Sequence, residues 1–388
     1  MKRILGLVAA TAMAAFAVPA EAQQQLKVGF VATFSGPGGA LGRDLYDGFM
    51  LGIEQSGGRL GGLTTEVIRE DDQLRPDVGL QVTQKLLQRD RVDIITGVVF
   101  SNIMMAIYQP IIESQTFVIS ANAGPSEIAG ARCSPFFFST SWQNDQPHEA
   151  MGAHLQRRGV GAAYIMAPNY QAGRDALTGF KRQFKGRILD EVYTTVNQPD
   201  YSAELTALRA ARPPATYVFY PGGMGVNFVR QYAQAGLTRR VPLYSAFTVD
   251  ATTVDAQGEA ALGTFGTAFW TYDLATGTNE LFVRSFLQKH NRMPSTYAAQ
   301  AYDSARLLHA ALTVSNLGNK DALRDALRKA DFPSVRGPFR FNNNHFPIQN
   351  FYLYETVRDA QGRFVQANRG VVLENHRDAY ASQCAMRW

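Results

Sequence analysis

The sequence predicts an α/β protein made of two doubly wound lobes. From Leu26 onward, short apolar runs typical of buried strands alternate with helix-length segments, which is the pattern of parallel sheets covered by helices. This alternation restarts near residue 143, giving two successive arrays over about 26–142 and 143–270. The 388 residues also exceed what one hydrophobic core usually holds.

The first 22 residues have the pattern of an export signal. Lys2 and Arg3 precede an apolar run from Ile4 to Val18, and Ala20-Glu21-Ala22 fits the small-x-small rule for cleavage. The run is shorter than the roughly 20 residues that span a membrane. We therefore predict a periplasmic protein, cleaved near Ala22.

Composition excludes several classes of function. Hydrophobic residues make up 46% and charged residues 18%, as in ordinary globular proteins. Cleavage removes two basic residues and one acidic residue, so the net charge falls from +5 to +4. No dense Lys/Arg patch with interleaved aromatic residues suggests a nucleic-acid partner.

The two cysteines, Cys133 and Cys384, would lie in an oxidising compartment. A disulfide between them is the expectation, and two buried free thiols are the alternative. Metal binding is disfavoured because no histidine lies at ligand spacing from either cysteine.

The first array contains the stretch Val92–Gly124, which predicts a strand, a polar turn, a helix, a second strand and a second polar turn. Its apolar runs are short and β-branched, as in strands buried on both faces. Pro76 is placed to begin a helix. The expected strands are 26–34, 64–70, 92–99, 117–119 and 135–141, with helices over 41–55 and 76–88.

The second array and the C-terminal part follow the same pattern. The expected strands are 162–166, 188–195, 216–220, 242–247, 265–270, 336–341 and 351–357. One helix is expected to begin at about residue 146, and six more cover 172–184, 202–211, 226–235, 278–291, 295–314 and 320–329. We assign 23–142 and 271–348 to lobe 1, and 143–270 and 349–388 to lobe 2.

Aromatic and small polar residues recur where the strands end, and ligands of open α/β sheets bind at that edge. The candidates are Phe100, Ser101, Asn102, Asn122, Trp142, Asn144, Tyr170, Met224 and Phe247. No catalytic constellation accompanies them. H-E-x-x-H and G-x-S-x-G are absent, His148 and His154 are six residues apart, and Glu70-Asp71-Asp72 lacks the spacing of a calcium loop. We predict no enzyme activity, no cofactor and no metal.

The mature sequence resembles the periplasmic solute-binding proteins of the branched-chain amino acid type, which serve ABC importers. The resemblance rests on short motifs in a fixed order: Val28-Gly29-Phe30 with Phe34-Ser35-Gly36-Pro37, Gly97–Asn102, Ile119–Ser126, Asn169-Tyr170, Arg230-Gln231 with Ala235-Gly236-Leu237, Ala301-Tyr302-Asp303 and Gly337–Phe341. Ser101-Asn102 and Thr140–Asp145 are similar to the branch associated with aromatic acids.

This resemblance implies a type I periplasmic binding fold, with two α/β lobes joined by three crossovers and a ligand held between them. Ser101 matches the serine that binds the ligand carboxylate, and Asn122, Ala123 and Gly124 match the turn that does the same. Tyr170 matches an aromatic residue of the second lobe that closes over the ligand.

Two departures from the family pattern bear on the ligand. The carboxylate that pairs with an α-ammonium is replaced by Ala246, with Asp250 and Asp273 as the substitutes that loops could bring in. In the turn after the predicted strand 216–220, other family members have an aromatic residue, and this sequence has Pro221-Gly222-Gly223-Met224 instead. The smaller residues suggest room for a longer or flatter ligand. A buried ammonium without a counter-charge is costly, so an aromatic or other apolar carboxylate is favoured.

The resulting prediction is a monomeric substrate-binding component that closes on a small carboxylate and delivers it to the permease subunits of an inner-membrane ABC transporter. The alternatives are a binding protein for branched-chain or other amino acids, and a sensor that presents its ligand to a chemoreceptor or kinase. An exported hydrolase is disfavoured because no nucleophile–base pair is visible.

Overall fold

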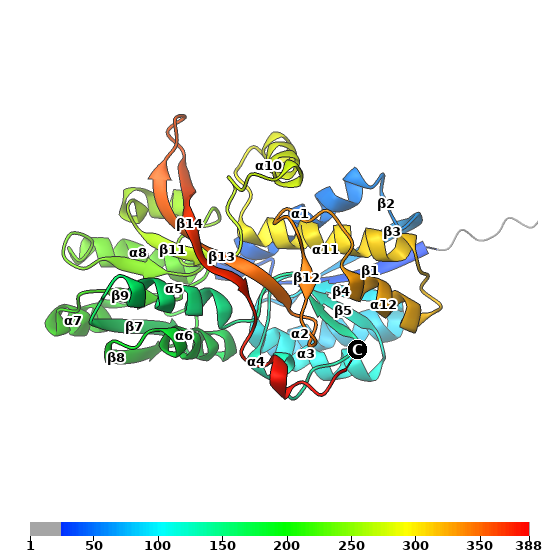
Figure 1. Cartoon of the computed structure of the whole chain (residues 1–388), viewed down its shortest axis with the longest axis horizontal. Coiled ribbons are helices and arrows are strands. Elements are labelled where there is room, and N and C mark those ends of the chain that lie inside the picture. The colour runs from blue at the N-terminus through cyan, green and yellow to red at the C-terminus, as the bar shows by residue number, and fades with distance from the viewer. Residues whose placement is uncertain (1–24, 388) are drawn as a thin grey trace, which may run out of the picture.

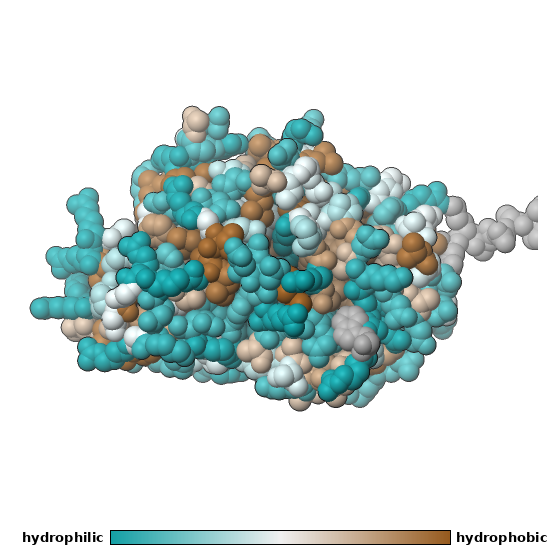
Figure 2. All heavy atoms as spheres, viewed as in Figure 1, coloured by the Kyte–Doolittle hydropathy of each residue, from teal (hydrophilic) through white to brown (hydrophobic). Residues whose placement is uncertain are grey.

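The computed structural model describes residues 25–387, in which the chain forms two α/β lobes side by side (Figure 1). The predicted export signal lies outside the described residues. None of the helices between residues 25 and 387 is long and apolar enough to cross a membrane. On the face shown in Figure 2 the surface is mostly hydrophilic, with small groups of hydrophobic side chains near the middle of the view.

The first lobe is built on a six-stranded sheet with the order β2-β3-β1-β4-β5-β6, parallel except for the short β2. Its central strands are fully buried because helices lie over both faces. The strands are β1 (Gln25–Ala32), β2 (Arg59–Leu60), β3 (Leu63–Asp71), β4 (Ile94–Gly97), β5 (Phe117–Ser120) and β6 (Phe137–Ser139). The helices are α1 (Gly39–Gln55), α2 (Pro76–Lys85), α3 (Ser101–Glu113), α4 (Ser126–Ala129), α10 (Gly277–His290), α11 (Thr296–Thr313) and α12 (Lys320–Lys329).

The second lobe has an eight-stranded mixed sheet with the order β12-β13-β11-β10-β9-β7-β8, and β14 pairs with β13. The strands from β7 to β11 are parallel, and the late strands β12, β13 and β14 join antiparallel. The strands are β7 (Ala162–Pro168), β8 (Arg187–Thr194), β9 (Thr216–Val218), β10 (Leu243–Ser245), β11 (Phe265–Ala268), β12 (Arg340–Phe341), β13 (Pro347–Arg358) and β14 (Phe364–His376). The helices are α5 (Gln146–Arg157), α6 (Gln171–Gln183), α7 (Ser202–Ala211), α8 (Gly223–Gln234) and α9 (Val254–Gln257).

The predicted fold class is confirmed, although the short β2 was not predicted and several strands, such as β6, are shorter than expected. β4 is shorter than 92–99 because Gly97 and Val98 both have positive φ and turn the chain. The strand expected over 336–341 is reduced to β12, since Gly337 has a positive φ and Pro338 has no N–H to donate. β14 was not predicted; its pairing with β13 contains several register shifts, so its sequence lacks the regular alternation of a strand.

The three crossovers between the lobes follow β6, follow β11 and precede β13, and a buried arginine joins all of them. Arg336 pairs with Asp303 of α11 at 2.8 Å and donates to the carbonyl oxygen of Thr140 in the first crossover at 2.6 Å. It also donates to Gln349 Oε1 near the start of β13, just after the third crossover, at 2.8 Å, and lies over the ring of Phe269 in the second. This cation therefore fixes the hinge region from which the lobes extend.

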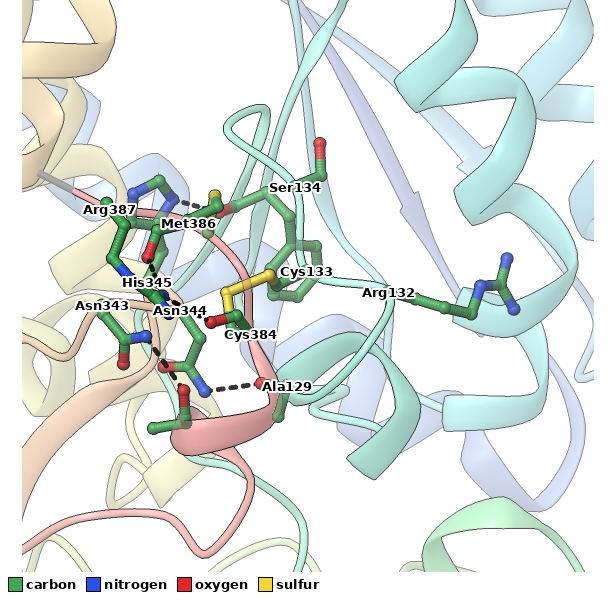
Figure 3. Close-up of a disulfide and its surroundings, with 12 residues drawn as sticks. Ala129, Arg132, Cys133, Ser134, Asn343, Asn344, His345, Cys384, Met386 and Arg387 are labelled. Carbon is green, nitrogen blue, oxygen red and sulfur yellow. Dashed lines mark hydrogen bonds between the residues drawn. A yellow bond between two sulfur atoms is a disulfide. The ribbon is translucent and has the colours of Figure 1, made fainter.

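The C-terminal segment leaves the second lobe and returns to the first, where Cys384 forms the predicted disulfide with Cys133 (Figures 1 and 3). Asn344 supports the same corner by donating to the carbonyl oxygen of Ala129 at 2.8 Å. The segment 349–388, which the predicted division gave to lobe 2, is thus fastened at its end to lobe 1.

Candidate functional site

A cavity lies between the lobes, and clefts between two lobes are common places for small-molecule sites. Both lobes contribute to its wall, as does the first crossover. The lining residues are Leu41, Val99, Phe100, Ser101, Asn122, Trp142, Asn144, His148, Tyr170, Ala172, Phe219, Pro221, Phe247 and Tyr297.

The polar end of this cavity is organised around Ser101. The left-handed turn at Gly97 and Val98 ends β4 and brings Ser101 to the first position of α3. The side chain is 2% exposed, and its Oγ accepts a hydrogen bond from Asn144 Nδ2 at 3.0 Å. The Ser101 hydroxyl also donates to Asn144 Oδ1, but at 3.5 Å this bond is long, so a ligand carboxylate placed closer would be the better acceptor for the proton.

Asn144 is fixed from both lobes. Its Nδ2 also donates to Asp175 Oδ2 of α6 at 2.8 Å, and its Oδ1 accepts from the backbone N–H of Gly124 at 3.0 Å. Asp175 in turn accepts from the hydroxyl of Ser126 in the first lobe at 2.8 Å. The orientation of the Ser101 hydroxyl therefore depends on a network that crosses the cleft.

Several helices begin at this cavity. Ser101 is the first residue of α3, while Ala172 and Tyr297 are each the second residue of their helices, α6 and α11. Pro221 directly precedes the N-cap of α8. The first N–H groups of a helix have no carbonyl partner within it and carry partial positive charge. At α11 the Ser295 side chain already accepts from the N–H groups of Tyr297 and Ala298, whereas α3, α6 and α8 have no such side-chain cap, so these three ends favour an anion.

Aromatic rings form the remaining wall. Phe247 of the second lobe stacks on Trp142 with 4.4 Å between ring centroids and lies 6.0 Å from Tyr297 of α11. Tyr170 lies 6.2 Å from Phe219 in a stacked arrangement and 6.1 Å from Phe100 across the cleft. These rings offer flat apolar surfaces to a flat apolar ligand.

The cavity is electrically neutral. The described residues that line it include no Asp, Glu, Lys or Arg. His148 is hydrogen-bonded through Nδ1 to the Tyr217 hydroxyl, and burial lowers its pKa to about 3, so the ring is uncharged at neutral pH. Burial also raises the pKa of Tyr170, which keeps its hydroxyl protonated as a donor.

The structure brings together seven of the twelve predicted ligand-binding residues. Phe100, Ser101, Asn122, Trp142, Asn144, Tyr170 and Phe247 line the cavity, whereas Asn102, Ala123, Gly124, Gly223 and Met224 do not.

The turn after β5 was expected to bind the carboxylate, and several of its polar groups are already hydrogen-bonded within the protein. The N–H of Ala123 donates to the Val98 carbonyl oxygen, and that of Gly124 to Asn144, so both are already used. The Asn122 side chain donates to the Val99 carbonyl oxygen and accepts from Gln300 Nε2. These bonds tie the turn to Val98, Val99 and Asn144.

The small-residue turn before α8 was expected to leave room for a longer ligand, and the first lobe fills that room. A Cβ added at Gly223 would lie 2.9 Å from the Cβ of Pro37, and one at Gly222 would lie 2.9 Å from the Pro37 carbonyl oxygen. Met224 points away from the cavity, and its sulfur accepts from the N–H of Asn197 at 3.4 Å. The glycines thus allow the two lobes to touch.

The two acidic residues proposed as substitutes for the missing carboxylate lie elsewhere. Asp250 lines a separate cavity on the other side of Phe247, and Asp273 accepts from the N–H of Asn368 in β14.

Seven lining residues were not among the sequence-based candidates: Leu41, Val99, His148, Ala172, Phe219, Pro221 and Tyr297. Phe219 and Pro221 follow β9, so their position after a strand was a usable signal. Tyr297 lies in α11, far along the chain from either array, and no local pattern marks it.

Comparisons with known proteins agree with this architecture. A family model described as "Periplasmic binding protein" matches residues 25–362. A benzoate complex of an ABC-transporter solute-binding protein from R. palustris has 30% identity and a TM-score of 0.88, covering 93% of this chain and 100% of that one.

A solute-binding protein from Rhodopseudomonas palustris BisB5, solved with 3,4-dihydroxybenzoic acid, has 26% identity and a TM-score of 0.84 and covers 92% of this chain and 99% of that chain. "Leu/Ile/Val-binding protein homolog 6" of Brucella melitensis is 24% identical over 92% of this chain and 94% of its own. These relatives are transporter components that bind ligands, and not enzymes. The chain therefore belongs to the periplasmic binding protein family, as a solute-binding protein of the ABC-transporter type.

Proposed function

We propose that this protein captures an aromatic or other apolar carboxylate in the cavity between its lobes and delivers it to the permease of an ABC importer. One observation carries the proposal. Hydroxyl groups and helix N-termini meet at an aromatic cavity, and the described residues around it include no charged side chain. Such a site stabilises an anionic head and a flat apolar body.

The head group is bound by neutral donors. The Ser101 hydroxyl, oriented by Asn144, donates to one carboxylate oxygen, and the N-terminus of α3 supplies backbone N–H groups and a favourable dipole. Tyr170 and Tyr297 line the same space, one from each lobe, and their hydroxyl groups can add further donors. Hydrogen bonds to a charged acceptor are stronger than those between neutral groups.

An α-amino acid fits this cavity poorly. Its ammonium lies beside its carboxylate, so both groups would have to be accommodated at the Ser101 end. The position expected to supply a carboxylate is Ala246, which is fully buried behind Phe247. Asp175 is the nearest acidic group in the network, and both of its oxygens are used by Ser126, Gln171 and Asn144.

The R. palustris relative in complex with benzoate supports this ligand class. Family membership supports the transport role, export through residues 1–22, and hinge closure in which a ligand that contacts both lobes shifts the population to the closed form.

The test is calorimetry with matched ligands. 3-Phenylpropanoate and phenylalanine differ only in the α-ammonium, so we expect the acid to bind at least about 100-fold more tightly, since an unpaired buried charge costs several kcal/mol. Benzoate and leucine extend the comparison to the ligands of the two kinds of relative. Tighter binding of phenylalanine or leucine would refute the proposed ligand class. Uptake of labelled acid in cells lacking the protein tests delivery.

A further inference from the structure

A second cavity of about 450 Å³ lies on the far side of Phe247 from the first. Both lobes line it: Asp250 and Gln366 come from the second lobe, and Ser295 and Thr296 from the start of α11 in the first. Because Phe247 lines both cavities, its ring is the partition between them.

Two polar atoms in this region have no hydrogen-bond partner among the described residues. Asp250 is 6% exposed, and its Oδ2 is buried and unpaired, whereas its Oδ1 accepts from the N–H and hydroxyl of Thr252 at 2.7 and 2.6 Å. The Nε2 of Gln366 is likewise buried and unpaired. A buried donor or acceptor left unpaired costs free energy, so a bound ligand group that forms hydrogen bonds with these two atoms would be stabilised.

The two unpaired atoms have opposite requirements. Asp250 Oδ2 needs a hydrogen-bond donor, and Gln366 Nε2 needs an acceptor. A hydroxyl group can serve either atom, because its proton can go to the carboxylate and its lone pairs can accept from the amide. An ammonium has no lone pair and would satisfy Asp250 alone.

The remaining wall is apolar and aromatic. It includes Phe247, Trp270, Tyr272 and Tyr354, and the Tyr354 hydroxyl is already used by the Val249 carbonyl oxygen at 2.9 Å. Phe247 has a φ of +56°, a conformation that costs energy for a residue with a Cβ and is found at ligand clamps. A ligand that spans both cavities must turn this ring aside.

We propose that the cavity beside Asp250 is a distal compartment of the ligand cleft, which receives a hydroxyl group at the end of the aromatic acid opposite its carboxylate. The inference rests on the proposed function. It assigns Asp250 and Gln366 as specificity-determining residues and makes a hydroxylated aromatic acid the preferred ligand.

The test compares pairs of acids that differ by one hydroxyl: benzoate with 4-hydroxybenzoate, and trans-cinnamate with trans-4-hydroxycinnamate. Two pairs are used because the hydroxyl lies farther from the carboxylate in the cinnamate than in the benzoate. In the wild-type protein we expect the hydroxylated member of at least one pair to bind ten or more times as tightly. Asp250→Asn keeps the acceptor for Thr252 and replaces the unpaired oxygen by a donor, so this preference should fall at least fivefold. Asp273→Asn, which changes the charge equally outside the cavity, is the matched control.

Thermal melting shows whether Asp250→Asn is folded, and Gln366→Leu tests the same compartment if it is not. If the acids bind but the hydroxyl confers no preference, or both Asp variants lose the preference equally, the distal compartment is refuted. If none of the four acids binds, the proposed function itself fails.

Discussion

Replacement of Ser101 by alanine tests how the carboxylate is bound. The hydroxyl is buried, and its one close protein bond is the one it accepts from Asn144 at 3.0 Å. Removing a hydrogen bond to a charged group costs about 1.5–3 kcal/mol. The dissociation constant of an aromatic acid should therefore rise roughly 10- to 150-fold.

The assay is isothermal calorimetry of benzoate with wild type, Ser101→Ala and Ser114→Ala. Ser114 caps the other end of the same helix, where its hydroxyl donates to the Ile111 carbonyl oxygen at 2.7 Å, far from the cavity. This control separates an effect on the ligand from a general effect on α3. We expect the affinity of the Ser114 variant to stay within about twofold of wild type, as for surface changes that alter stability by less than ~0.5 kcal/mol.

Equal affinities for wild type and Ser101→Ala would show that the carboxylate does not bind at the start of α3. The same conclusion would follow if both serine variants weakened binding equally. In either case the orientation of the ligand would have to be reversed, with its apolar end toward Asn144.

Three further predictions concern the hinge, the tail and lobe closure. Arg336→Leu leaves its carboxylate partner buried without a cation, so the free energy of unfolding should fall by about 3–5 kcal/mol in urea melts; a smaller loss than for an exposed arginine would contradict the hinge role. Reducing the Cys133–Cys384 disulfide, whose cysteines are 251 residues apart, should destabilise the protein by about 2–4 kcal/mol, and identical melting with and without reductant would disprove this. Gly223→Val should hold the lobes apart, which should weaken ligand binding and increase the radius of gyration measured by solution scattering. Gly277→Ala, where an added Cβ meets no atom within 4 Å, should leave the affinity and the radius of gyration unchanged.

The sequence was sufficient to predict the architecture because its signals are local. Parallel strands buried on both faces are short runs of β-branched residues, and the run that ends at Gly97 was located within a few residues. The cavity residues nearest these strand ends, such as Phe100 and Ser101, were found for the same reason. The disulfide was predicted because the sequence has only two cysteines and a predicted export signal.

The parts of the candidate site that the sequence did not predict depend on contacts between segments that are distant in the chain. Gly223 appeared to make room for the ligand, but Pro37 of the other lobe occupies that space, and no pattern within either segment predicts their contact. Tyr297 lines the cavity because α11, which follows the parallel strands of the second lobe in the sequence, packs against the first lobe. Asp250 falls in its own cavity because the turn after β10 places Phe247 between it and Ser101.

The same contacts explain how binding can be coupled to closure. Ser101 belongs to the first lobe, while Tyr170, Phe219 and Phe247 belong to the second, so a ligand gains its full set of contacts only when the lobes meet. A ligand shifts an equilibrium only by its difference in affinity for the two states. A carboxylate without an aromatic body would keep only the few polar contacts of the second lobe, such as Tyr170, and we expect it to close the protein less completely. We therefore expect the ring to supply most of the difference in affinity that drives closure, and the carboxylate to fix the orientation of the ligand.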